Sequence, residues 1–194
     1  MIKFENGKYF SYDMMGEFHS SGVWIHPKRR INSFEVILVL EGTVYIAEET
    51  REYALQKNQL LLLEPFKEHY GYKTVSEPTA FYWFHFFTDL DIPLKSYNGT
   101  DIYEIKQLLK KLLHISNSPI YSPAAADSAG YLILEELIRL SAEDNSSNHA
   151  LAARISEYIR NNIKRGITVS DGARNFGYNA DYIGKYLKKI TVSV

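Results

Sequence analysis

The segment VSDGARNFGYNADYIGKYLKK near the C-terminus carries side chains that could hydrogen-bond DNA. If residues 180–189 form a helix, Ile183 and Leu187 lie on the face that holds it against the protein, because they are four residues apart. The opposite face then presents groups for base edges, followed one turn later by lysines for phosphates. We expect these DNA-binding residues to be Asn179, Ala180, Asp181, Gly184, Lys185, Lys188 and Lys189.

The elements around this segment have the proportions of a helix-turn-helix. Thr168 or Ser170 is a plausible N-cap of a short helix that Gly177 ends, and Asn179 is a plausible N-cap of the next. A preceding helix over LAARISEYIRNNIKR stops at Gly166. A surface helical hairpin that only packs remains the alternative to a DNA-binding role.

Charge is divided unequally along the chain. Residues 150–194 hold 8 Lys and Arg against 3 acidic residues, a net charge of +5, whereas the rest of the chain carries −6. An acidic body with a basic tail indicates that the tail meets a polyanion.

Residues 155–189 resemble the first DNA-binding subdomain of the AraC/XylS-type transcription regulators. The matching positions are Gly177, Tyr178, Asn179, Tyr182, Ile183, Lys185, Leu187, Lys188 and Lys189. Two glycines depart from the pattern: Gly172 replaces a large apolar residue, and Gly184 removes a side chain that would contact bases. The family also carries a second helix-turn-helix, which we do not find here, so we expect weakened DNA binding.

The pattern of the first 142 residues predicts an α+β fold. Short β-branched and aromatic runs separated by Gly, Pro and Asn from about residue 8 to 90 indicate a sandwich or barrel. Helical periodicity follows over 102–142, broken by SPIYSP before Pro123. We expect a barrel over 1–95 whose residues 1–20 form an N-terminal arm, helices for dimerisation over 96–142, a linker at 143–150 and the partial helix-turn-helix over 151–194.

Glu35 followed by Gly42, and Asn58, Pro65 and His69 after them, resemble parts of the two cupin motifs. Cupin enzymes use two further histidines, which would fall near PKRRI, and these are absent. His26 is close to them but at the wrong spacing. We therefore expect neither a metal nor another cofactor.

The order HPKRR, FEVILVLEG, LLLLEPFKEHYGY and FYWFHF resembles the metal-free cupin of AraC-type regulators, which binds an effector such as a sugar. Such a pocket needs aromatic faces and a few fixed polar groups. Strand alternation places Trp83 and His85 on one face of their strand and Tyr82 on the other. The candidate effector-binding residues are Trp24, Arg30, Tyr82, Trp83 and His85, with His26 and His69 as second choices. Core packing is the alternative role for each.

The leading hypothesis is a DNA-binding transcription regulator that senses a small polar effector and forms a homodimer. The alternatives are a ligand-binding and dimerisation protein with little DNA binding, and a metal-dependent cupin enzyme. The chain has no cysteine, and neither a signal peptide nor an apolar run long enough to span a bilayer is visible. We therefore expect a cytoplasmic protein that is not an enzyme and does not contact a membrane.

Overall fold

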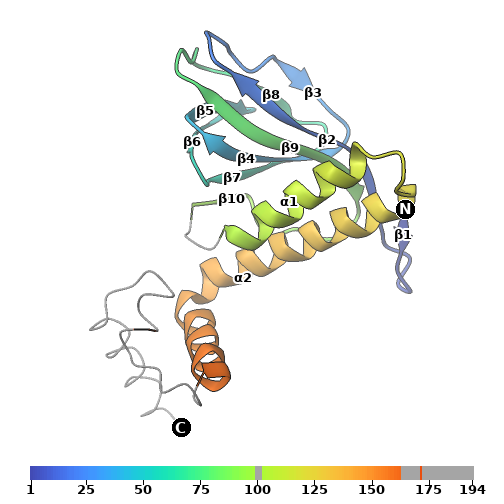
Figure 1. Ribbon diagram of the computed structural model, residues 1–194. Coiled ribbons are helices and arrows are strands. Elements are labelled where there is room, and N and C mark those ends of the chain that lie inside the picture. Colours follow the sequence, from blue (N-terminus) through green and yellow to red (C-terminus); the bar gives the residue numbers. More distant parts are fainter. Residues whose placement is uncertain (99–101, 163–170, 172–194) are drawn as a thin grey trace. The chain divides into compact units, whose positions relative to one another are not determined.

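The computed structural model of the 194-residue chain describes residues 1–98, 102–162 and 171. The chain divides into two compact units, Met1–Ser141 and Ala142–Val194. The first unit contains the strands and helix α1, and it is drawn in Figure 1 from blue to yellow-orange. Among the described residues, no helix is long and apolar enough to cross a membrane.

Within the described residues the strands form two antiparallel sheets. The six-stranded sheet has the order β1-β2-β9-β4-β7-β10, with β1 at Ile2–Lys3, β2 at Tyr9–Ser20, β4 at Phe34–Glu41, β7 at Leu60–Leu63, β9 at Thr79–Thr88 and β10 at Ser96–Tyr97. The four-stranded sheet has the order β3-β8-β5-β6, with β3 at Arg29–Arg30, β5 at Thr43–Glu48, β6 at Arg51–Gln56 and β8 at Glu68–Tyr70. This β-rich, cupin-like arrangement confirms the predicted strand region.

The tight turns fall where the sequence predicted them. Gly42 joins β4 to β5 with a φ of 70°, and Asn58 lies between β6 and β7 with a φ of 66°. Positive φ costs glycine little and asparagine less than most residues. These two residues therefore end their strands because of their own backbone preferences.

One apolar cluster joins the two sheets. The inward face of the six-stranded sheet contributes every second residue of its strands, as alternation requires. The cluster consists of Ile37, Val39, Val44, Ile46, Tyr53, Leu55, Leu61, Leu63 and Phe81. The start of β4 and the end of β9 replace this apolar pattern with Glu35 and His85, which face the same side.

The helices cover the other face of the six-stranded sheet. Helix α1 spans Tyr103–Ser116 and helix α2 spans Pro123–Asn162. Figure 1 shows α1 and the first part of α2 running side by side below the strands. Their buried residues form a second cluster with Phe84 and Phe86 of β9, among others. Because both of its faces are covered, β9 is apolar almost throughout.

Two segments differ from the sequence-based prediction. Residues 143–150 lie within α2 instead of forming a linker. Their serines and asparagines disfavour a helix only mildly, and the segment contains neither glycine nor proline to end it. The predicted arm over residues 1–20 is largely a strand, because β2 pairs with β9 from Phe10 to Ser20.

Candidate ligand-binding site

A cavity of about 560 Å³ opens between the inward face of β2, β4 and β9 and the segment 24–33. We call it the Glu35 cavity, after the carboxylate in its lining. Strand β2 carries a bulge between Tyr12 and Met14, and the bulged Asp13 and Met14 both line the cavity. Bulges re-aim side chains in this way next to binding sites.

Aromatic side chains form much of the cavity wall. The Phe18 ring lies 4.7 Å from that of Trp24 and 4.8 Å from that of Phe81, measured between ring centroids. Trp83 lies on β9 opposite Gly16 of β2. A Cβ atom at position 16 would come within 2.4 Å of the Trp83 indole. Gly16 therefore provides the space in which this indole lies against β2.

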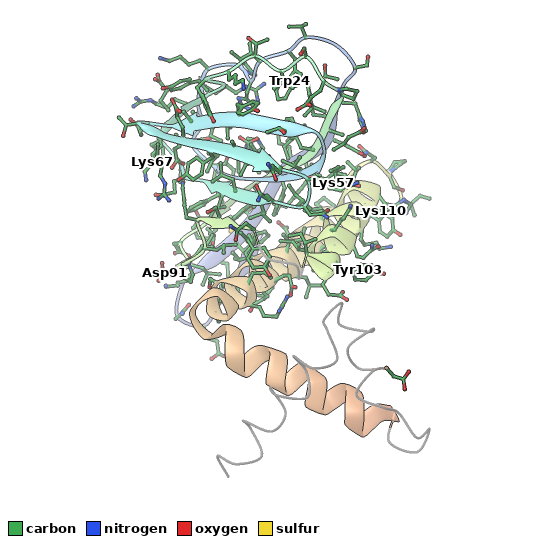
Figure 2. All side chains as sticks on the ribbon, turned by 90° about the vertical axis from the view of Figure 1, so that its left-hand side faces the viewer. Trp24, Lys57, Lys67, Asp91, Tyr103 and Lys110 are labelled. Atoms are coloured by element: carbon green, nitrogen blue, oxygen red, sulfur yellow. The ribbon has the colours of Figure 1, made fainter. Side chains whose placement is uncertain are left out.

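Figure 2 places Trp24 above the strands and Tyr103 of α1 below them. The aromatic wall and the helices therefore lie on different sides of the six-stranded sheet. A ligand in the Glu35 cavity would contact strands and the segment 24–33, but not α1.

Polar side chains meet beside this wall. Glu35 is 2% exposed, and its two carboxylate oxygens lie 3.6 Å from Nε2 of His69 and 3.6 Å from Nε2 of His85. The other ring nitrogen of His85, Nδ1, is 2.9 Å from the Ser33 hydroxyl. Glu35 and His85 are directly opposite each other in the β4–β9 register. The fold thus brings together groups that are 50 residues apart in sequence.

Burial and the charges of neighbouring side chains determine which groups of this cluster are protonated. Burial lowers the pKa of His26 and of His69 below the usual histidine value. Burial alone would raise the pKa of Glu35, but the neighbouring imidazoles of His85, His69 and His26 together lower it. At neutral pH the cavity therefore contains an ionised Glu35 beside neutral His26 and His69.

The tautomer of His26 follows from its hydrogen bond. Its Nδ1 lies 2.9 Å from the Pro27 carbonyl oxygen, which can only accept. Neutral His26 therefore carries its proton on Nδ1 and leaves Nε2 as an acceptor. Because His26 lines the Glu35 cavity, the lining contains acceptor groups on both Glu35 and His26.

The structure brings together most of the residues expected to bind an effector. Trp24, His26, Trp83 and His85 line the Glu35 cavity. His69 is fully buried behind it, next to Glu35. Tyr82 points to the opposite face of β9, into the cluster that contacts the helices.

Arg30 is exposed on β3, and its neighbour Arg29 lines the cavity instead. Tyr82 and Arg30 lie outside the cavity for the same reason. Side chains alternate between the two faces of a strand, so a residue one position from a lining residue points to the opposite face.

Sequence reasoning missed several lining residues. Glu35 was interpreted only as a remnant of a metal motif, although a lone acid within an apolar strand is itself a sign of a site. Ser33, Phe18 and Phe81 carried no distinguishing pattern, because their place depends on pairing between distant strands.

His26, Glu35, His69 and His85 are all side chains of types that can ligate metals. Among the residues that the structure describes, no group of three or more His, Cys, Asp or Glu side chains is placed to hold a metal ion. We therefore consider the cluster as a set of hydrogen-bonding groups.

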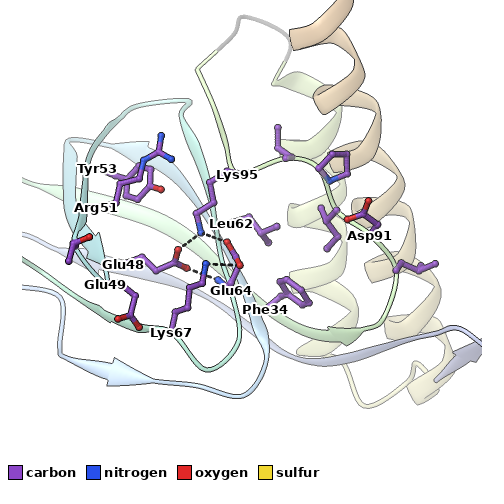
Figure 3. A pocket seen from close by; sticks show the side chains of 15 residues that line it. Phe34, Glu48, Glu49, Arg51, Tyr53, Leu62, Glu64, Lys67, Asp91 and Lys95 are labelled. Carbon is purple, nitrogen blue, oxygen red and sulfur yellow. Dashed lines mark hydrogen bonds and ion pairs between the residues drawn. The ribbon is translucent and has the colours of Figure 1, made fainter.

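A second hollow, of about 540 Å³, lies beside the segment 90–95 (Figure 3). Its polar groups satisfy one another: Glu48 accepts from Lys95 Nζ and, at 2.7 Å, from the Glu64 amide. Glu64 also pairs with Lys67 at 2.7 Å. The charges of Glu48, Glu64, Lys67 and Lys95 in this hollow are therefore already paired with one another.

The residues expected to contact DNA are Asn179, Ala180, Asp181, Gly184, Lys185, Lys188 and Lys189, and all lie outside the described residues. Their predicted role therefore stays a prediction.

Several known proteins are similar to this chain. The uncharacterized HTH-type transcriptional regulator YisR of Bacillus subtilis is 23% identical over 194 residues, covering 85% of this chain and 67% of that protein. A cupin-2 domain protein of Shewanella frigidimarina is 18% identical over 36% of this chain and 66% of its own, with a TM-score of 0.30. A cupin superfamily protein of Desulfitobacterium hafniense is 12% identical over 44% of this chain and 82% of its own, with a TM-score of 0.33.

The family model described as the AraC-like ligand binding domain matches residues 14–157. The match contains the second half of β2, strands β3 to β10, helix α1 and most of α2, and thus all the residues of the Glu35 cavity except Asp13. The chain therefore belongs to the family of AraC-like ligand binding domains.

Proposed function

We propose that this chain is a transcription regulator whose DNA binding responds to a small polar effector in the Glu35 cavity. The observation that carries the proposal is a cavity with aromatic walls and a buried carboxylate inside an AraC-like ligand binding domain. The similarity to an HTH-type regulator supports the regulatory role.

The effector we propose is a sugar-like molecule. The Trp83 indole offers a flat face for stacking, and the carboxylate and imidazole groups offer fixed hydrogen-bonding positions. Four of the lining residues, Trp24, His26, Trp83 and His85, were the expected contacts for such a ligand.

DNA binding is assigned to residues 151–194, with base contacts from Asp181 and Lys185 and phosphate contacts from Lys188 and Lys189. The basic charge of this region and its resemblance to a helix-turn-helix support this assignment. The effector acts only if it binds more tightly to one of two states that differ in DNA affinity.

We also propose a homodimer formed through the helices. Tyr103 of α1 and Leu132 of α2 are 65% and 54% exposed, although both are large and apolar. An apolar contact between two copies would remove such side chains from water. Analytical ultracentrifugation of the chain and of Leu132→Glu tests this: the variant should shift toward the monomer.

A gel-shift experiment on the DNA upstream of the gene tests the regulatory role. The chain should bind with an affinity that falls as salt rises, because lysine contacts to phosphate release counterions. The double variant Lys188→Ala, Lys189→Ala should bind more weakly and with a smaller salt dependence.

A second candidate is a ligand-binding and dimerisation protein without DNA binding of its own. The observation that favours it is the family match itself, which is to a ligand binding domain. Absence of salt-sensitive binding by the whole chain in the same gel shift would support this second candidate and contradict the first.

A further inference from the structure

The lining of the Glu35 cavity contains buried polar atoms without partners. Glu35 Oε2 and Trp24 Nε1 have no hydrogen bond among the described residues. A buried carboxylate oxygen left in this way destabilises a fold unless something else supplies a donor. Oε2 of Glu35 thus lacks a donor, and the indole N–H of Trp24 lacks an acceptor.

The negative charge of Glu35 also lacks a permanent counter-charge. The basic groups in ion-pair range of Glu35, among the described residues, are His69 and His85, each at 3.6 Å and therefore beyond hydrogen-bond length. His69 is neutral at neutral pH because burial lowers its pKa. Arg29 lines the same cavity, but it is exposed on β3.

The remaining walls suit a positive charge. Trp83, Trp24, Phe18 and Phe81 line the cavity, and their ring faces attract cations. Asp13 also lines the cavity, but like Arg29 it is exposed, so the buried charge in the lining is that of Glu35. An anionic ligand would have to approach this carboxylate, and a neutral one would leave it without a counter-charge.

We propose that the effector of the Glu35 cavity is a small hydroxylated amine, with an ammonium group bound to Glu35 and a hydroxyl oxygen that accepts from Trp24 Nε1. An amino sugar has this chemistry. The inference rests on the proposed function, since it names the class of molecule that the same cavity senses.

Tryptophan fluorescence reports on this cavity directly, because the chain contains 2 tryptophans and both Trp24 and Trp83 line it. Titrations of the whole chain with glucosamine, glucose and glucuronate compare a cation, a neutral molecule and an anion that share the same sugar ring. Benzylamine and benzyl alcohol repeat the comparison without a sugar ring. In each series the amine should bind about tenfold or more tightly than its neutral counterpart, as expected for one charge-assisted hydrogen bond.

The variant Glu35→Gln should lose this preference for amines, whereas Glu77→Gln, which removes an exposed carboxylate, should keep it. Circular dichroism establishes that each variant is folded, and the titrations of the unmodified chain do not depend on either variant.

Equal or tighter binding of the neutral or anionic probes would overturn the inference, as would an amine preference that survives in Glu35→Gln. Failure of all five probes to change the fluorescence would also contradict it. None of these outcomes would affect the gel shift, so the regulatory role would stand or fall separately.

Discussion

At the scale of single residues, the cavity depends on side chains whose neighbours hold them in place. Trp83 lies where it does because Gly16 leaves room for the indole, and His85 is oriented by Ser33 on one side and Glu35 on the other. The sequence predicted that Trp83 and His85 share a face. It could not predict Gly16 or Ser33, because their roles arise only from the β2–β9 and β4–β9 register.

Gly16→Ala should displace the Trp83 indole. The added Cβ would lie 2.4 Å from the ring, so the ring must move or the strands must separate. We expect an altered tryptophan emission spectrum and a loss of about 1–3 kcal/mol in the free energy of unfolding, as for other overpacked sites. Gly22→Ala is the matched control, because nothing lies within 4 Å of its Cβ position. Equal effects of the two changes would contradict this role of Gly16.

The buried ionisable groups should make the protein less stable in acid. His26 and His69 have lowered pKa values in the folded state, so unfolded chains bind more protons once the pH falls below the usual 6.5. The lowered pKa of Glu35 acts in the same direction below 4.5. Stability should thus be constant above about pH 7 and decline below it, by about 1.4 kcal/mol per pKa unit of lowering.

Urea denaturation across this pH range measures the effect. His26→Gln should reduce the decline between pH 6.5 and 4.5, whereas His19→Gln, which changes an exposed side chain, should leave the contribution of the buried pair in place. A decline of the same size in His26→Gln and in the unchanged chain would show that His26 does not contribute.

At the scale of elements, strands and helices whose apolar residues recur with a clear periodicity were predictable from the sequence. Segments without such a periodicity were not. Gly42, Asn58 and Pro123 mark boundaries that the structure confirms, since each residue has a backbone preference that its position requires. Residues 143–150 are polar enough to suggest a linker, yet they continue α2, because helix propagation needs only the absence of a breaker. Residues 9–20 fell within the predicted strand region but were also assigned to an arm, because their pairing with β9, a strand distant in sequence, could not be predicted.

Gly42→Ala should destabilise the β4–β5 turn. A side chain there would need a φ of 70° and would bring Cβ within 2.3 Å of the Pro78 carbonyl oxygen. Gly7→Ala is the control, because Gly7 also has a positive φ, 81°, but nothing lies within 4 Å of its Cβ position.

We expect a loss of about 1 kcal/mol for Gly7→Ala from backbone strain alone, and clearly more for Gly42→Ala. Thermal unfolding of both variants tests this order. A smaller loss at Gly42 than at Gly7 would mean that the turn relaxes to accept the side chain.

At the scale of the whole molecule, the Glu35 cavity and the helices occupy different parts of the Met1–Ser141 unit, with the six-stranded sheet between them. Strand β9 contributes to both, through Trp83 and His85 on one face and Phe84 and Phe86 on the other. A ligand that shifts β9 would therefore change the surface on which α1 and α2 pack.

The most direct test of the account is a thermal-shift screen of small hydroxylated metabolites against the whole chain and against Trp83→Ala. A ligand that binds the folded state alone raises the melting temperature, by an amount that grows with its concentration. If the Glu35 cavity binds the effector, at least one compound should stabilise the unchanged chain, and its effect should be lost in Trp83→Ala. Compounds that stabilise both proteins equally would place the ligand outside the Glu35 cavity and contradict the account.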